Sequence, residues 1–445
     1  MASNKALIVA APASGSGKTV ITLALLRHFR DAGTPVSSFK IGPDYIDPAF
    51  HRAAGGSICV TLDGWAMRPS TVDALVAAAC AGDGDGDGLL IGEGVMGLFD
   101  GAAGGGGSTA DMAAAFGWPV VLVVDVRGQA ASAAAVVDGF RHFRDDVRIA
   151  GVIFNRVGSQ SHERALCEAC ASIDVRVLGC VPTDPALALA DRHLGLVQAG
   201  EHSALDEFID GAAAVVARRV DMDALAALAV PTAVAQVAPA MPPTIPALGQ
   251  RIAVARDAGF AFAYPYLLEG WRGAGAEILP FSPLAGEAPD GTADAVYLPG
   301  GYPELHAAAI AANRGFLDGL RDAAARGAVV FGECGGYMVL GERLVDGAGH
   351  SHAMAGLLPL ETSFADPKLR LGYRQARLVD DGPFGNRGAQ FRGHEFHYAR
   401  VLREGADGQT GALFECRDSR GEASTGAGLR RGAVMGSFVH LIDVV

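Results

Sequence analysis

The sequence predicts an α/β protein of two domains, each built around a mostly parallel sheet. Three observations support this prediction: the length of 445 residues, the high apolar content, and an alternation of short apolar runs with alanine-rich stretches. A chain of this length exceeds one ordinary core. Because 50% of the residues are hydrophobic and only 19% are charged, a packed globular protein is expected.

Short apolar runs in the N-terminal half predict buried parallel strands. These runs are Ala6–Ala11, Leu89–Ile91, Val120–Val126, Gly151–Phe154 and Val175–Val181. The alanine-rich stretches between them, such as Ile21–Arg30 and Ala130–Phe143, predict helices. Strands that alternate with helices in this way favour a parallel sheet with helices on its faces.

The C-terminal half repeats this alternation after a change in composition. Further strands are predicted at Arg251–Ala255, Glu277–Pro280, Ala295–Leu298 and Ala328–Gly332, with helices between them. The segment 226–249 separates the two halves and is rich in proline with little charge, which predicts an interdomain linker. We therefore expect one domain at residues 1–225 and another at residues 250–445.

The charge and hydropathy patterns restrict the partners and the location of the protein. The net charge is −13, from 36 basic and 49 acidic residues, which argues against non-specific binding to nucleic acid or anionic membranes. No apolar run reaches the roughly 18 residues of a membrane span. The N-terminal apolar stretch ends in a glycine-rich loop rather than a signal cleavage site. We expect a cytoplasmic protein, and a homodimer is the assembly that we consider.

A glycine-rich loop with the sequence APASGSGKT follows the first predicted strand and precedes a helix, as a phosphate-binding loop requires. Glycines let the backbone curl so that its N–H groups point at phosphate oxygens. Lys18 is expected to bridge the β- and γ-phosphates, and the Thr19 hydroxyl to ligate Mg²⁺. Pro12 stands where the usual loop has its first glycine. The predicted ATP-binding residues of the loop are Ser14, Gly15, Ser16, Gly17, Lys18 and Thr19.

Acidic residues follow two of the strands near this loop. Lys40 ends a strand, and Asp44 and Asp47 lie in the proline-bounded loop after it; a purely structural turn is the alternative for this loop. Glu93 ends another buried strand, where Mg²⁺ ligands commonly lie, and is our first choice for that role. Lys40 is expected to contact phosphate. We also expect Thr109 to cap the helix that follows.

A cysteine between a strand and a helix marks a second reactive site. Cys334 lies in VVFGECGGY with glycines on both sides, the pattern of a nucleophile elbow in which the following N–H faces a developing oxyanion. The helix N-terminus is expected to lower the pKa of the thiol. Gly335 and Gly301, in LPGGYPE, are the predicted oxyanion donors.

A cysteine nucleophile needs a general base. Of the twelve histidines, His440 near the C-terminus is the best candidate, and His394 and His397 compete with it. Chain position alone does not choose among them.

Taken together, these motifs make the sequence similar to the corrinoid a,c-diamide synthases over nearly its whole length. The resemblance rests on SGSGKT, KIGPDYIDPAFH (Lys40–His51), EGVMGLFDG (Glu93–Gly101), LPGGYPE, GECGGY, GHEFHY and the terminal GSFVH. It implies an N-terminal domain like dethiobiotin synthetase and a C-terminal class I glutamine amidotransferase domain with a flavodoxin-like sheet.

The resemblance also implies the chemistry of the two sites. Cys334 is then the nucleophile that attacks glutamine and His440 its base, while the synthetase site uses ATP, Mg²⁺ at Thr19, Asp44 and Glu93, and a corrinoid acid. The acidic residues of that site are Asp44, Asp47, Glu93 and Asp100. Many class I amidotransferases place a glutamate two residues after the histidine, where this chain has Ile442. Asp443, a backbone carbonyl or no group at all would then orient the imidazole.

Other functions remain compatible with parts of the pattern. A P-loop ATPase switch of the partitioning type usually carries an early loop lysine where Ala13 stands, and it has no need of the GECGGY domain. Cobyric acid synthase and nickel-tetrapyrrole diamide synthases are related glutamine-dependent ligases. Among corrinoid substrates we favour metal-free hydrogenobyrinic acid over cobyrinic acid.

Overall fold

The computed structural model describes residues 4–81, 88–189, 191–192, 195–196, 198–232, 244–405, 408–423 and 426–445. The chain divides into two compact units. The first comprises Met1–Trp65, Val72–Gly101 and Gly106–Ala240, and the second comprises Met241–Val445 with the short segments Ala66–Thr71 and Ala102–Gly105. In the described part of the chain, no helix has both the length and the apolar character needed to cross a membrane.

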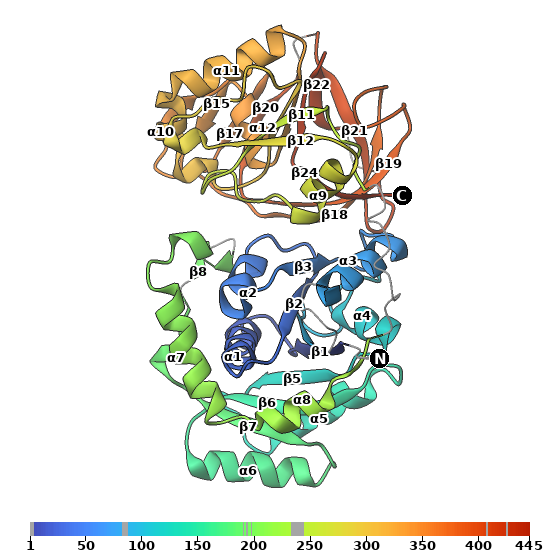
Figure 1. Ribbon diagram of the computed structural model, residues 1–445, viewed down its shortest axis with the longest axis vertical. Helices are drawn as coiled ribbons and strands as arrows, with labels where there is room; N and C mark the ends of the chain where they lie inside the picture. Colours follow the sequence, from blue (N-terminus) through green and yellow to red (C-terminus); the bar gives the residue numbers. More distant parts are fainter. Residues whose placement is uncertain are drawn as a thin grey trace. The chain divides into compact units, whose positions relative to one another are not determined.

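The first unit is an eight-stranded sheet in the order β3-β2-β4-β1-β5-β6-β7, with β10 paired to β1 (Figure 1). Its neighbouring strands run parallel except for the antiparallel β10. The strands are β1 (Lys5–Ala10), β2 (Val36–Ile41), β3 (Cys59–Leu62), β4 (Leu89–Glu93), β5 (Val120–Asp125), β6 (Ile149–Val157), β7 (Val177–Pro182) and β10 (Val230–Pro231). The parallel sheet predicted for this half is confirmed.

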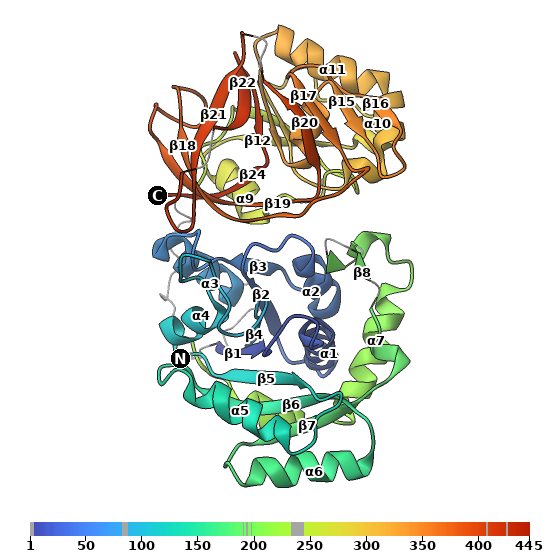
Figure 2. The same ribbon diagram turned by 180° about the vertical axis from the view of Figure 1, so that it is seen from behind.

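Helices alternate with these strands, and α1 and α7 lie side by side (Figures 1 and 2). Apolar side chains of both helices pack in one core with residues of β1, β4 and β5. The helices are α1 (Lys18–Asp31), α2 (Asp47–Gly55), α3 (Pro69–Ala81), α4 (Thr109–Phe116), α5 (Ser132–His142), α6 (Gln160–Ala171), α7 (Leu205–Ala217) and α8 (Met222–Leu228). Short elements are η1 (Pro185–Leu187), β8 (Asp191–Arg192), β9 (Gly195–Leu196) and η2 (Ala199–Glu201).

Two local expectations differ from the structure of this unit. The cap of α4 is Ser108, not Thr109, because Ser108 Oγ accepts from the backbone N of Asp111 while Asp111 accepts from the backbone N of Ser108. Thr109 is already the first helical residue, and its hydroxyl accepts from the backbone N of Val95 at 3.1 Å. Within the segment 226–249, the chain first completes α8 and then adds β10 to the sheet, and residues 233–243 lie outside the described part.

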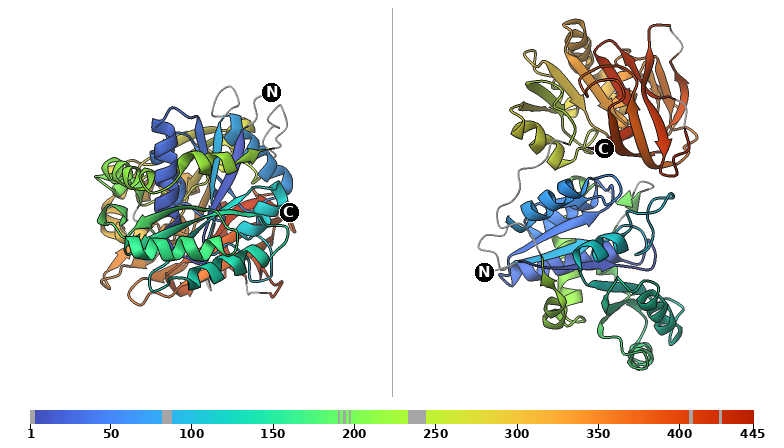
Figure 3. Two further views of the ribbon diagram at one scale, coloured as in Figure 1. Left: turned by 90° about the horizontal axis from the view of Figure 1, so that it is seen from below. Right: turned by 90° about the vertical axis from the view of Figure 1, so that its right-hand side faces the viewer.

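The second unit holds a ten-stranded sheet in the order β12-β11-β13-β14-β23-β22-β21-β18-β19-β24. Strands β12 to β23 in this order are parallel, and the remaining pairs are antiparallel. The strands are β11 (Arg251–Ala255), β12 (Glu277–Phe281), β13 (Ala295–Leu298), β14 (Val329–Glu333), β18 (Arg370–Leu378), β19 (Gln390–His397), β21 (Gly411–Asp418), β22 (Ala427–Arg431), β23 (Val434–Ser437) and β24 (Val439–Val444). Figure 3 shows the strands β18 to β24, orange to red, as a layer beside the yellow elements of the same unit.

A smaller four-stranded sheet and several helices complete this unit. The sheet comprises β16 (Ser351–Ala353), β15 (Arg343–Val345), β17 (Leu360–Ser363) and β20 (Arg400–Glu404). The helices are α9 (Pro265–Gly273), α10 (Ala307–Ala312), α11 (Arg314–Ala325) and α12 (Gly335–Leu340), with 3₁₀ turns η3 (Pro283–Ala285) and η4 (Pro303–Leu305). The predicted parallel strands are β11 to β14, whereas the antiparallel half had no counterpart among the predictions.

Candidate active sites

The glycine-rich loop joins β1 to α1 in a tight curl. Gly15 and Gly17 have φ values of +78° and +92°, in the left-handed region that favours glycine. A Cβ on Gly17 would lie 2.2 Å from Nδ2 of Asn155, so no side chain fits there. Asn155 Nδ2 donates to the Ser16 carbonyl at 2.9 Å, and Lys18 Nζ donates to the Met96 carbonyl at 2.8 Å. Contacts with Asn155 and with Met96 therefore hold the loop in place.

Arg156, next to Asn155 at the end of β6, is a site residue that the sequence reasoning missed. Its backbone φ is 62°, its guanidinium donates to the Gly15 carbonyl at 2.8 Å, and it is paired with Asp125. Both residues reach the loop from more than a hundred residues away along the chain, so the local pattern gave no signal. A polar Asn-Arg pair closing a buried strand beside a phosphate loop was the one available clue.

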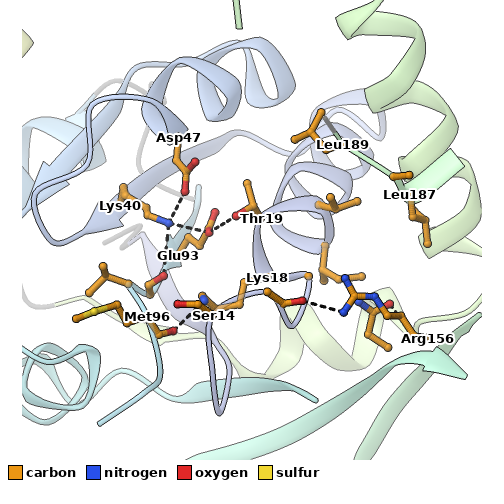
Figure 4. A pocket seen from close by; sticks show the side chains of 18 of the residues that line it. Ser14, Lys18, Thr19, Lys40, Asp47, Glu93, Met96, Arg156, Leu187 and Leu189 are labelled. Carbon is orange, nitrogen blue, oxygen red and sulfur yellow. Dashed lines mark hydrogen bonds and ion pairs between the residues drawn. The ribbon is translucent and has the colours of Figure 1, made fainter. Parts of the chain in front are cut away.

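Lys40 lies at the centre of a buried charge cluster. Its Nζ is 2.5 Å from Asp47 Oδ2 and 2.7 Å from Glu93 Oε1, with Asp44 Oδ2 at 3.9 Å. Figure 4 shows Lys40 between Asp47 and Glu93, with Thr19 reaching the same glutamate. Burial alone would lower the pKa of Lys40, but the Asp47 and Glu93 carboxylates raise it above its usual value. Lys40 is therefore a permanent cation in this site.

Glu93 is held by three donors. Thr19 Oγ1 and Lys40 Nζ each lie 2.7 Å from Oε1, and Nε2 of the buried His51 lies 2.7 Å from Oε2. Burial would raise the pKa of Glu93, but Lys40 and His51 lower it well below its usual range. His51 closes the KIGPDYIDPAFH motif, yet its contact with Glu93 was not predicted. Glu93 is thus an anion oriented toward Thr19 and the loop.

The other predicted acidic residues, Asp44 and Asp100, lie on different sides of this cluster. Asp44 Oδ1 accepts from the backbone N of Ile46 and of Asp47, both at 2.9 Å, and so shapes the turn before α2. Asp100 Oδ2 accepts from the backbone N of Gly97 at 3.0 Å and contributes to the electrostatic field at Lys18. The structure thus gathers Asp44, Asp47 and Glu93 around Lys40 and sets Asp100 toward Lys18.

A cavity of about 670 Å³ opens over the loop and this cluster. Its lining combines the loop with residues of β2, β4, β6 and the segment after β7: Ser14, Gly15, Gly17, Lys18, Thr19, Val20, Ile21, Lys40, Asp44, Asp47, Glu93, Gly94, Val95, Met96, Asn155, Arg156, Pro182, Thr183, Asp184, Leu187, Ala188 and Leu189. The volume suits a nucleotide-sized ligand. The hydroxyl and carboxylate oxygens of Thr19, Asp44 and Glu93 are hard donors of the kind that Mg²⁺ prefers.

Cys334 forms a strained elbow between β14 and α12. Its φ and ψ are 47° and −102°, an unusual conformation for a residue with a side chain. The turn is fixed by the Cys334 backbone N, which donates to the Ser437 carbonyl at 2.8 Å, and by Gly336 N, which donates to the Pro299 carbonyl at 3.2 Å. The predicted elbow geometry is therefore present.

Glycines surround this elbow because there is no room for side chains. A Cβ on Gly335 would lie 3.0 Å from the backbone N of Gly301 and 2.8 Å from Pro303 Cδ. The backbone of the two predicted oxyanion residues thus lies side by side next to the sulfur. A Cβ on Gly301 would meet the Gly259 carbonyl oxygen at 2.1 Å.

His440 borders the cysteine across Gly300. A Cβ on Gly300 would lie 2.4 Å from Cε1 of His440, 3.2 Å from its Nε2 and 3.4 Å from Cys334 Cβ. Burial, followed by the neighbouring His394 and His397, lowers the pKa of His440 to about 3. The imidazole is therefore neutral near pH 7 and able to accept a proton.

The two competing histidines have other contacts. His394 on β19 lies opposite His440 on β24 in the register of these two strands. Burial and then Arg374 lower the pKa of His394 to about 3. His397 stacks on Phe438 with ring centroids 4.0 Å apart, and its ring nitrogens face Glu395 Oε1 at 3.0 Å and the Ala399 carbonyl at 3.1 Å.

The expected lowering of the Cys334 pKa is wrong for this structure. Burial, and then the Glu304 carboxylate, raise the pKa of the thiol above its usual value, and the Gly335 backbone N–H opposes them only in part. Glu333 and Glu395 act in the same direction as Glu304. Cys334 is a thiol in the resting site, so its proton must leave as it attacks.

The carboxylate of Asp443, one of the groups considered for orienting His440, is bound by other side chains. This buried carboxylate accepts hydrogen bonds from Arg68 and from Thr71 Oγ1 at 2.7 Å, within the second unit. The same carboxylate accepts from the backbone N of Val444 at 2.9 Å, so both of its oxygens are engaged at the end of β24. Ile442, two residues after His440, is skipped in the pairing of β19 with β24 and has no polar atom in its side chain.

Comparisons with known proteins agree with both halves of this description. The family model described as CobQ/CobB/MinD/ParA nucleotide binding domain matches residues 7–197, and the model described as CobB/CobQ-like glutamine amidotransferase domain matches residues 251–443.

Curated relatives match over almost their full length, and those cited here are all named hydrogenobyrinate a,c-diamide synthase. The protein of Brucella abortus biovar 1 is 54% identical over 99% of this chain and 98% of its own. That of Rhizobium meliloti is 55% identical over 98% and 99%, and that of Mesorhizobium japonicum is 49% identical over 98% of each chain. The chain therefore belongs to the hydrogenobyrinate a,c-diamide synthase family.

Proposed function

We propose that this protein uses ATP and glutamine to amidate the a and c carboxylates of hydrogenobyrinic acid. The observation that carries the proposal is the pairing, in one chain, of the loop holding Lys18 and Thr19 with the elbow holding Cys334 beside His440. The names of its relatives point to the same substrate. A homodimer and a cytoplasmic location stay predictions of the sequence.

At the elbow, the Cys334 sulfur attacks the side-chain amide carbon of glutamine. The thiol proton passes to Nε2 of His440, and the carbonyl π electrons move to the oxygen, which the N–H groups of Gly301 and Gly335 stabilise. The C–N bond then breaks, and the proton held by His440 leaves with ammonia. Water hydrolyses the thioester and releases glutamate.

At the phosphate loop, an oxygen of the substrate carboxylate attacks the γ-phosphorus of ATP and ADP leaves. Lys18 and Lys40 supply positive charge where negative charge gathers on the phosphoryl oxygens. Mg²⁺ would be held by Thr19, Asp44 and Glu93 and would neutralise phosphate charge. Ammonia displaces phosphate from the acyl phosphate and leaves an amide. Two such cycles give the diamide.

A Cys334→Ser variant tests the division of labour between the two sites. With ammonium salt as the nitrogen source it should form the diamide at the wild-type rate, and with glutamine it should form none. Mass spectrometry of the corrin product counts the amides. Loss of both activities in a folded variant would refute the assignment of Cys334 to glutamine hydrolysis alone.

The substrate is tested by offering the wild-type protein hydrogenobyrinic acid, cobyrinic acid and the a,c-diamide itself. A preference for the metal-free tetrapyrrole is expected. Amidation of the preformed a,c-diamide instead would indicate a later ligase such as cobyric acid synthase. Turnover of none of the three, with ATP hydrolysis intact, would refute the proposed substrate.

A further inference from the structure

We propose that Glu333, held by Tyr297, is the positioning residue that orients His440 and balances its charge during glutamine hydrolysis. The inference rests on the proposed function of the Cys334 site and supplies the group that the position of Ile442 leaves missing. It is carried by the arrangement of three side chains from β13, β14 and β24.

Glu333 is a buried carboxylate at the end of β14, directly before the nucleophile. Its side chain is 4% exposed, and its Oε2 lies 4.0 Å from Nδ1 of His440. Glu333 pairs with Ser437 at the end of β23, and the chain continues from there into β24. This pairing brings the residue before Cys334 close to His440.

Two donors fix the carboxylate in place. Tyr297 Oη donates to Oε2 at 2.5 Å, and the backbone N of Leu441 donates to Oε1 at 3.0 Å. The second donor belongs to the residue after His440, so Glu333 also ties down the backbone that carries the imidazole. A side chain anchored at both oxygens can hold its neighbour in one orientation.

The two edges of the imidazole face different groups. Its Cε1–Nε2 edge borders Gly300, which in turn contacts Cys334, whereas Nδ1 points toward Glu333. This is the order thiol, imidazole, carboxylate that a cysteine–histidine nucleophile requires. At 4.0 Å the Nδ1 contact exceeds a hydrogen bond, and contacts of this kind commonly tighten when substrate binds.

The charge requirement supports the same role. When Nε2 takes the thiol proton, an imidazolium forms in a buried site beside His394 and His397, both of which oppose positive charge on His440. In the described part of the chain, Glu333 also faces the Tyr297 hydroxyl on β13, the Leu441 N–H on β24 and the Cys334 thiol. Burial raises the pKa of Glu333 to about 7, while Tyr297 and Leu441 favour its charged form.

Glu333→Gln is the main test because it keeps the shape of the side chain and one of the two acceptor oxygens but removes the charge. Release of glutamate from glutamine should fall about 100-fold in kcat with little change in KM, a smaller loss than removal of a directly bonded triad carboxylate causes. Ammonia-dependent amidation should be unchanged. The rise of the wild-type glutaminase rate near pH 7 should disappear in this variant.

Asp443→Asn is the matched control, since it removes the charge of another buried carboxylate on β24, one that is bound by Arg68 and Thr71. It should lower thermal stability yet leave the glutaminase kcat and its pH profile unchanged. Wild-type kcat and pH dependence in Glu333→Gln would overturn the proposal, as would an equal loss in Asp443→Asn.

Two further variants keep the test decisive if Glu333→Gln does not fold. Glu333→Asp retains a charge and should hydrolyse glutamine faster than Glu333→Gln. If Glu333→Gln does not fold, Cys334→Ser serves as the inactive reference for Glu333→Asp. Tyr297→Phe removes a donor and should move the acid limb of the glutaminase profile to higher pH, and an unmoved limb would contradict the role of Glu333. If wild-type protein releases no glutamate at all, the proposed function fails rather than this inference.

Discussion

Replacing Lys40 with methionine should destabilise the first unit strongly, because it leaves two buried carboxylates without their cation. The Lys40 side chain is 4% exposed and the Glu93 side chain 1%, and Lys40 Nζ lies within 2.7 Å of both Glu93 and Asp47. Methionine has a similar length and is apolar. The substitution therefore removes the charge with little change in packing.

The size of the effect follows from the burial of the cluster. Removing one partner of a buried ion pair costs about 3–5 kcal/mol. For a domain of roughly 150–250 residues, each kcal/mol shifts Tm by about 2–4 °C, so a decrease of about 6–20 °C is expected. Differential scanning calorimetry of the full chain, with circular dichroism as a second probe, measures this shift.

The loss should also depend on pH. Burial and the neighbouring Asp44 raise the pKa of Asp47 to about 7 even with Lys40 present, and without the lysine Asp47 takes up a proton more readily. A carboxyl group with a raised folded-state pKa stabilises the fold below its unfolded value, and that contribution is lost as pH rises through the folded value. Lys40→Met should therefore be more damaging at about pH 8 than at about pH 6.

Lys18→Met is the matched control in the same cavity. Lys18 Nζ donates to the Met96 carbonyl, and burial lowers its pKa, so loss of this charge should change Tm by less than a third of the Lys40 effect. Adding Asp47→Asn to Lys40→Met should recover part of the stability. Equal shifts for both lysine variants, or no recovery in the double variant, would refute the reasoning.

Three other predictions concern the remaining features of the two sites. Gly335→Ala should reduce glutamine hydrolysis about 100- to 1000-fold and spare ammonia-dependent amidation, since its Cβ would lie 2.8 Å from Pro303 Cδ. Arg156→Ala should raise the KM for ATP roughly tenfold by releasing the Gly15 carbonyl, measured by ADP release. The second unit should lose stability as pH falls from about 6.5 to about 3, because burial depresses the pKa of His440 and of His394. An acid titration followed by circular dichroism measures this loss, which should be smaller in a His394→Gln variant.

The sequence predicts most of the parallel strands of the two large sheets and the local shape of both site loops, because these depend on residues close together in the chain. Apolar runs such as Val120–Val126 mark strands buried on both faces. The antiparallel strands lack this signal: β18 mixes exposed and buried residues, and β20 is exposed along its whole length. Their place is set by pairing with distant strands rather than by their own composition.

The same distinction separates the site residues that motifs indicate from those they do not. Lys18, Thr19 and Cys334 lie in short motifs whose spacing fixes their geometry. His51 and Asn155 contribute through contacts at long sequence separation, with Glu93 and with the Ser16 carbonyl. Such contacts leave no periodicity in the chain.

The direction of the Cys334 pKa shows why a local motif does not fix the chemistry of a site. The helix N-terminus after Cys334 predicts a lowered pKa for the thiol, but the folded site buries the sulfur near Glu304, Glu333 and Glu395, so the thiol keeps its proton. His440 is neutral for a related reason, because burial removes the solvent that would stabilise its cation. The neutral thiol of Cys334 and the neutral imidazole of His440 react only when a substrate carbonyl is present. The sulfur then bonds to the carbonyl carbon while its proton moves to His440. The buried carboxylates thus tie formation of the nucleophile to the presence of glutamine, and alkylation of Cys334 should be slow without it.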